Sequence, residues 1–112
     1  MMRRLVRAAI QNATVTRGEG LTLRIDPVIL RAANILPLEE VEIVHHETGQ
    51  RFVTFAEEAG EGSGEVSVGR VRAGDIVSIV SWGSMHDGQT LAHYATIVSL
   101  DAQNRVVALS DH

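Results

Sequence analysis

Short runs of β-branched or alternating apolar residues recur along most of this chain, separated by turn signals rich in Gly, Asn and Asp. The predicted strands cover residues 14–16, 21–25, 41–44, 52–55, 66–68, 76–82, 95–100 and 106–109. Many short strands at this spacing are typical of a small β-barrel. Because 112 residues are enough for one such domain, we expect a single, mainly β domain over residues 1–112.

One segment breaks the β pattern and favours a helix. Asp26 can accept the free amide hydrogens of a first helical turn, and Pro27 suits the first helical position because it has no N–H. An apolar stripe follows, and Asn34 can adopt the left-handed conformation that ends a helix. The sequence therefore predicts a helix from Pro27 to just before Asn34, and a second short helical turn near residues 38–40.

The composition excludes several kinds of chemistry. All ten basic side chains are arginines, so there is no lysine amine for a conventional pyridoxal phosphate enzyme. No cysteine is available as a thiolate nucleophile or zinc ligand. The net charge of -4, spread along the chain, favours neither nucleic acid nor an anionic membrane, and the start is too polar for a signal peptide. We expect a cytoplasmic protein whose partner is a small molecule.

The motif order is similar to that of the aspartate 1-decarboxylase family. The similarity runs from Met1 to Val107 and includes Ile25-Asp26 and the segments 30–36, 40–43, 48–56, 62–64 and 74–77. The resemblance implies a mainly β, six-stranded double-psi β-barrel with one or two short helices. It also implies a homotetramer whose active sites lie between adjacent subunits.

The resemblance places a self-cleavage site at the Leu21-Thr22 bond. Family members cleave a Gly-Ser bond three residues before the Ile-Asp pair, and the serine becomes a pyruvoyl group that takes up the substrate amine. Here leucine and threonine replace that glycine and serine. Thr22 keeps a hydroxyl, but glycine reaches the strained turn needed for acyl shift more easily than leucine. A processed Thr22 would carry a 2-oxobutanoyl group, bulkier by one methyl.

Other positions depart from the family pattern. The family lysine near the first strand corresponds to Ala9, and the tyrosine that donates a proton corresponds to Phe55, which keeps the ring and loses the acid. A shorter segment, residues 68–75, replaces the Asn-Gly-Ala-Ala-Ala loop of the pocket. Gly62-Ser63 matches a second, structural Gly-Ser of the family, and a flexible turn is its expected role.

Some site residues are retained and others are new. The resemblance makes Arg51 the residue that holds the substrate carboxylate and Thr54 a pocket hydroxyl, although both could be ordinary strand residues. Glu57 and Ser78 replace aliphatic residues, so Glu57 is a candidate general acid or base unless it is simply a solvated strand end. The predicted substrate-binding residues are Arg51, Thr54, Phe55, Ser78 and Trp82, with core or interface packing as the alternative for Trp82.

The histidines give no metal-ligand spacing. His45 and His46 would point to opposite faces of a strand, and no His-Glu-x-x-His pattern occurs. The longest break in the β pattern, residues 83–92, predicts a loop in which His86 and Asp87 could form an acid/base pair. We expect neither a metal nor a separate cofactor.

Three functions remain open on these grounds. We prefer a family member that has lost pyruvoyl maturation and acts on another small molecule, in a specialised biosynthetic pathway, with Glu57, Thr22 and His86 as catalytic candidates. The second is an aspartate 1-decarboxylase that self-processes at Leu21-Thr22 and makes β-alanine. The third is a non-catalytic homologue that binds a ligand or partner.

Overall fold

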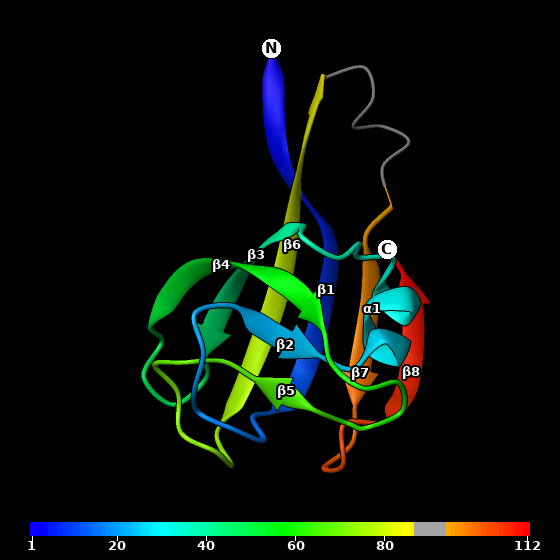
Figure 1. The fold of residues 1–112 in the computed structure, drawn as a ribbon. Coiled ribbons are helices and arrows are strands. Elements are labelled where there is room, and N and C mark those ends of the chain that lie inside the picture. The colour runs from blue at the N-terminus through cyan, green and yellow to red at the C-terminus, as the bar shows by residue number, and fades with distance from the viewer. Residues whose placement is uncertain (87–93) are drawn as a thin grey trace.

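The computed structural model describes residues 1–86 and 94–112, and these form eight strands and one short helix (Figure 1). The helix α1 spans Pro27–Ala33. The strands are β1 Met2–Thr14, β2 Leu23–Ile25, β3 Glu40–His45, β4 Arg51–Glu58, β5 Val66–Ser67, β6 Ile76–His86, β7 Thr96–Leu100 and β8 Val106–Asp111. The mainly β prediction is confirmed, and the sheet has two strands more than the six expected.

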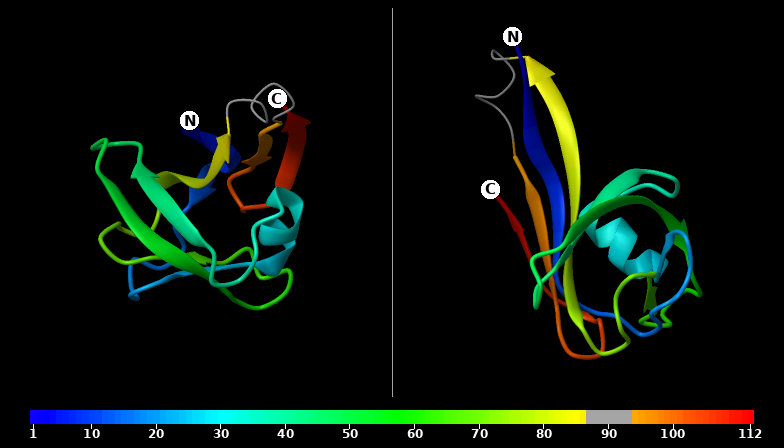
Figure 2. Two further views of the ribbon diagram at one scale, coloured as in Figure 1. Left: turned by 90° about the horizontal axis from the view of Figure 1, so that it is seen from above. Right: turned by 90° about the vertical axis from the view of Figure 1, so that its left-hand side faces the viewer.

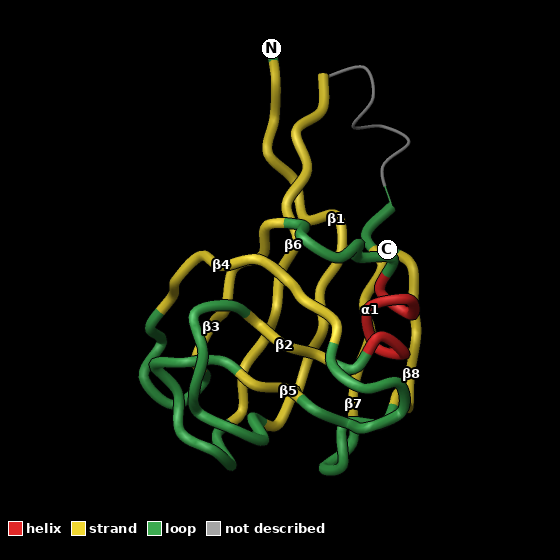
Figure 3. Tube along the Cα trace, in the orientation of Figure 1, coloured by secondary structure: helices red, strands yellow, loops and turns green. Residues whose placement is uncertain are grey.

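All eight strands belong to one sheet with the order β5-β2-β4-β3-β6-β1-β7-β8. The pairs β1-β7 and β2-β4 are parallel, and the other neighbours are antiparallel. The sheet curls into a half-barrel, consistent with a double-psi β-barrel (Figures 2 and 3). The start of β1 and the end of β6 project together beyond the barrel (Figure 1).

The helix has the ends that the sequence predicts. The Asp26 carboxylate accepts a hydrogen bond from the Val28 N–H at 2.9 Å, and Asn34 ends the helix with a φ of 56°. Leu38, by contrast, lies in a turn with a φ of 69°, and Glu40 already begins β3. The second helical turn was therefore a wrong prediction.

Two expectations about strand lengths were also wrong. The sequence predicts only residues 14–16 at the first strand, whereas β1 begins at Met2 because its first residues pair with the end of β6; β7 pairs only with residues 8–11. Residues 83–86 belong to β6 instead of a loop, since β1 continues to pair with them. The rest of the predicted loop, which includes Asp87, falls outside the described residues.

The core lies between the curled sheet and α1. Its largest fully buried side chains come from seven elements and their connections: Ile10, Val15, Leu23, Ile25, Ile29, Val41, Ile43, Val66, Val68, Val77, Ile79 and Val98. This packing fixes β2 beside β4 and so positions the segment that precedes β2. Within the described residues, no helix is long and apolar enough to span a bilayer.

Candidate active site

Two hydrogen bonds from β4 flank the peptide bond between Leu21 and Thr22. The Thr22 hydroxyl donates to Oε2 of Glu57 at 3.0 Å, and the Thr54 hydroxyl donates to the carbonyl oxygen of Leu21 at 3.1 Å. The parallel register of β2 and β4, which sets Leu23 beside Ala56, brings these groups together. The fold therefore gathers three sequence-predicted site residues around one bond.

This arrangement has the parts of an acyl-transfer site. Thr22 supplies a hydroxyl nucleophile, and the Glu57 carboxylate is placed to accept its proton. The Thr54 hydroxyl can stabilise negative charge that develops on the carbonyl oxygen of Leu21. Glu57 and Thr22 are half-buried, so this hydrogen bond is partly shielded from water.

Three other predicted residues lie on the outer face of the sheet. Arg51 and Ser78 both stand opposite Val44, one on each neighbouring strand, and directly opposite residues share a face. Phe55 follows Arg51 by an even number of positions along β4, so it points the same way. The Ser78 hydroxyl is bonded to Nε2 of His46 at 2.7 Å.

Two open pockets adjoin Leu21, whose side chain is 98% exposed. The first has a volume of about 290 Å³ and is lined by Gly20, Leu21, Phe52, Val53, Thr54, Val68, Gly69 and Arg70. The second, of about 440 Å³, is lined by Leu21, Leu38, Glu40, Val53, Thr54 and Phe55. Thr54 and Phe55 thus border open space, whereas Arg51 and Glu57 line neither pocket.

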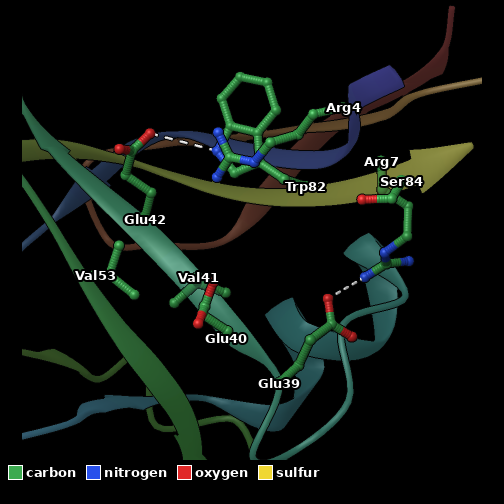
Figure 4. Close-up of a pocket in the computed structure, with 9 residues that line it drawn as sticks. All are labelled: Arg4, Arg7, Glu39, Glu40, Val41, Glu42, Val53, Trp82 and Ser84. Atoms are coloured by element: carbon green, nitrogen blue, oxygen red, sulfur yellow. Dashed lines mark hydrogen bonds and ion pairs between the residues drawn. The ribbon is translucent and has the colours of Figure 1, made fainter. Parts of the chain in front are cut away.

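Trp82 lies in a different, polar pocket of about 290 Å³ (Figure 4). The guanidinium of Arg4 stacks 4.4 Å from the centre of the Trp82 ring, and the indole N–H donates to Glu42 at 3.3 Å. Its lining consists of Arg4, Arg7, Glu39, Glu40, Val41, Glu42, Val53, Trp82 and Ser84. Val53 lines this pocket and both pockets beside Leu21, and Glu40 lines this pocket and the second of those two.

His86 is not brought to Thr22. It ends β6 opposite Met2, on the part of the sheet that projects beyond the barrel (Figure 1). Its predicted partner Asp87 is outside the described residues.

A half-buried polar cluster escaped the sequence analysis. Arg7 donates to the Ser81 hydroxyl at 3.3 Å, and both Arg7 and Ser81 bond to the carboxylate of Glu39. Burial alone would raise the pKa of Glu39, but the hydrogen bonds from Ser81 and Arg7 outweigh it and leave the pKa below its ordinary value. The three residues are far apart in sequence, so no local pattern could reveal them.

One group of described residues could offer ligand atoms to a metal. Donor atoms of His45, Glu47 and Asp75 lie within 4.8 Å of one another. Both ring nitrogens of His45 already have partners, Asp75 at Nε2 and Thr48 at Nδ1, each at 2.9 Å. His45 ends β3 and is buried, whereas His46 lies in the turn that follows and is exposed.

Comparison with known proteins identifies the family of this chain. The family model described as aspartate decarboxylase matches residues 1–107. A protein of Gloeobacter violaceus named aspartate 1-decarboxylase 2 is 37% identical over 118 aligned positions, which cover 97% of this chain and 94% of that protein. A protein of the same name from a Polaromonas species is 35% identical, over 97% of this chain and 93% of its own length. The chain belongs to the aspartate decarboxylase family.

Proposed function

We propose that the protein is a self-processing member of this family and that Leu21-Thr22 is its cleavage site. The observation that carries the proposal is a pair of hydrogen bonds on the two sides of this bond: Glu57 accepts one from the Thr22 hydroxyl, and Thr54 donates one to the carbonyl oxygen of Leu21. The names of the two relatives, both aspartate 1-decarboxylases, support it further. On sequence grounds we preferred a protein that had lost pyruvoyl maturation. We now prefer self-processing because, despite the leucine and threonine substitutions, the structure keeps a nucleophile (Thr22), a base (Glu57) and a hydrogen-bond donor (Thr54) at this bond.

The cleavage begins with an acyl shift from nitrogen to oxygen. Glu57 takes the hydroxyl proton as Oγ1 of Thr22 attacks the carbonyl carbon of Leu21, and Thr54 stabilises the carbonyl oxygen. The C–N bond then breaks, and Glu57 returns the proton to the leaving nitrogen. The product is an ester between Leu21 and the side chain of Thr22, with a free amine at residue 22.

The ester is resolved by elimination. Loss of the Cα proton of residue 22 expels the carboxylate of Leu21 and leaves an enamine. One water molecule then converts the enamine to a 2-oxobutanoyl group and releases ammonia. Such a group takes up a substrate amine and accepts the electron pair freed by decarboxylation. By family analogy the substrate is aspartate and the product β-alanine.

The chain's own residues have defined parts in the substrate reaction. Phe55 borders the pocket beside Leu21 and has no acidic proton to donate. Glu57, whose carboxylate lies beside residue 22 before processing, is placed to hold the proton that replaces carbon dioxide on the product. By family analogy, Arg51 holds the substrate carboxylate, and Thr54 supplies a hydroxyl to the pocket.

A time course of cleavage tests the proposal. Purified precursor is incubated and its fragments are quantified by denaturing mass spectrometry, for the parent chain and for Glu57→Gln and Glu58→Gln. Because a general base contributes about 10²- to 10⁴-fold, Glu57→Gln should slow cleavage by that order. Glu58→Gln, an exposed change one residue further along β4, should cleave at the parent rate. Equal rates for both variants, or no cleavage of the parent chain, would refute the proposal.

A non-pyruvoyl enzyme in the same pocket is the second candidate. Two substitutions favour it: Phe55 replaces the tyrosine that donates a proton in the family, and Glu57 places a carboxylate where the family has an aliphatic residue. This candidate requires an intact chain with a small-molecule activity that Glu57→Gln abolishes. The time course above therefore separates the two functions.

We also propose that the chain assembles through the outer face around Leu21, as the expected cytoplasmic homotetramer. Leu21, Leu38, Val53 and Phe55 lie around one pocket with 98%, 71%, 57% and 42% of their surfaces exposed. Contiguous apolar surface of this kind is typical of an interface between proteins. Sedimentation of the parent chain should give a tetramer, and Val53→Glu should give smaller species; a monomeric parent would contradict this assembly.

A further inference from the structure

The pocket between Leu21 and Arg70 has an unusual charge balance. Its eight lining residues contain one charged side chain, that of Arg70, and no carboxylate. Within residues 1–86 and 94–112, the guanidinium of Arg70 forms no salt bridge or hydrogen bond. Its five N–H donors are thus available to a ligand.

Arg70 is exposed, but one aromatic ring and the backbone of the preceding glycine restrict where it lies. Its guanidinium lies 5.4 Å from the centre of the Phe52 ring, close enough for a cation–π contact. The preceding Gly69 donates its N–H to the carbonyl oxygen of Gly20 at 3.2 Å. A Cβ at Gly69 would lie 2.6 Å from that oxygen, so only glycine allows this approach. The segment that bears Arg70 is therefore attached directly to the residue before Leu21.

Arg70 shares a face of β4 with Thr54, and Arg51 does not. Successive strand residues point to opposite faces, so Phe52 and Thr54 point one way and Arg51 the other. Because Arg70 stacks on Phe52, it lies on the side from which Thr54 reaches the carbonyl oxygen of Leu21. Within one chain, Arg70 is the arginine that lines the same pocket as Thr54.

We infer that Arg70 forms an anion subsite that binds a carboxylate of the small molecule acted on at residue 22. The inference rests on the proposed function and adds a specificity-determining residue to it. A planar guanidinium suits a carboxylate because it can donate two parallel hydrogen bonds. The apolar walls from Leu21, Phe52 and Val68 favour a short carbon chain behind that group.

Succinate is a suitable probe, since it carries carboxylates but has no amine that could condense with a carbonyl group. Its binding is measured by isothermal titration calorimetry on the full chain, with succinamide as the uncharged comparison. Arg70→Gln should weaken succinate binding by about tenfold or more, the loss expected for a charge-assisted pair, and leave succinamide unaffected. Arg72→Gln removes the same charge from an exposed position outside the pocket and should leave succinate binding unchanged.

Failure of this inference is distinguishable from failure of the proposed function. Equal weakening by Arg70→Gln and Arg72→Gln, or no succinate binding by the parent chain, overturns the subsite even if Leu21-Thr22 is cleaved. Arg70-dependent binding to a chain that stays intact supports the subsite and refutes self-processing. A thermal melt of both variants checks that each remains folded.

Discussion

Replacement of Asp26 by alanine should destabilise the fold strongly. Asp26 is 4% exposed, and its carboxylate accepts backbone hydrogen bonds from Val28, Gly62 and Gly64, all at 2.9 Å. It thereby caps α1 and holds the turn of residues 60–64 against the helix. At about 1 to 2 kcal/mol for each lost bond, the variant should lose about 4 kcal/mol of unfolding free energy. That corresponds to a fall of roughly 15–20 °C in Tm for a domain of this size.

The unfolding free energy lost in Asp26→Ala should depend on pH. Burial by itself would raise the pKa of Asp26, but the hydrogen bonds from Gly64, Val28 and Gly62 outweigh it and lower the pKa below its ordinary value of 3.8. A carboxylate with a lowered pKa in the folded state stabilises the fold above its unfolded pKa and ceases to do so as the pH falls through the folded value. The difference in unfolding free energy between the parent chain and Asp26→Ala should therefore become smaller below about pH 4.

Urea unfolding at pH 7 and pH 3, followed by circular dichroism, measures both effects. Glu61→Gln is the matched control, because Glu61 is an exposed carboxylate near the same helix and pairs with Arg31 in water. It should leave the unfolding midpoint unchanged at pH 7. If Asp26→Ala costs no more stability than Glu61→Gln, the role assigned to the buried carboxylate is refuted.

Three further changes test other parts of the structure. Asn104→Ala should cost about 2 to 4 kcal/mol in urea unfolding, because the buried amide bonds both backbone groups of Thr14 at 2.8 Å; a loss below about 1 kcal/mol would contradict this. Gly18→Ala should lower Tm, since its Cβ would lie 2.1 Å from the carbonyl oxygen of Val71, and an unchanged Tm would show that the backbone there moves freely. Thr54→Val should slow cleavage by about 10²- to 10³-fold with little change in Tm, and parent-like cleavage would exclude its role as oxyanion donor.

Local chemistry explains which elements could be predicted from sequence. The helix was predictable because its cap, its proline and its left-handed end are all within one short segment around Asp26 and Asn34. Most of β1 was not, because the arginines near its start obscure the strand pattern, and pairing with β6 and β7 decides its conformation. A local sequence pattern does not predict which distant strands pair.

The same distinction holds for the site. The sequence alone identified three candidates, Thr22, Thr54 and Glu57. Their proximity in the structure depends on the register of β2 against β4, which the sequence does not show. Arg70 was passed over because the sequence shows only a shortened segment there. Its stacking on Phe52 becomes visible in three dimensions alone.

The intact mass of the purified chain under denaturing conditions tests the central claim most directly. The account predicts two fragments, residues 1–21 and 22–112, with the second lighter by one molecule of ammonia than the unmodified fragment. That deficit identifies a carbonyl group at residue 22 and excludes simple hydrolysis of the peptide bond. A single species at 12.1 kDa would contradict self-processing and leave the non-pyruvoyl enzyme as the better account.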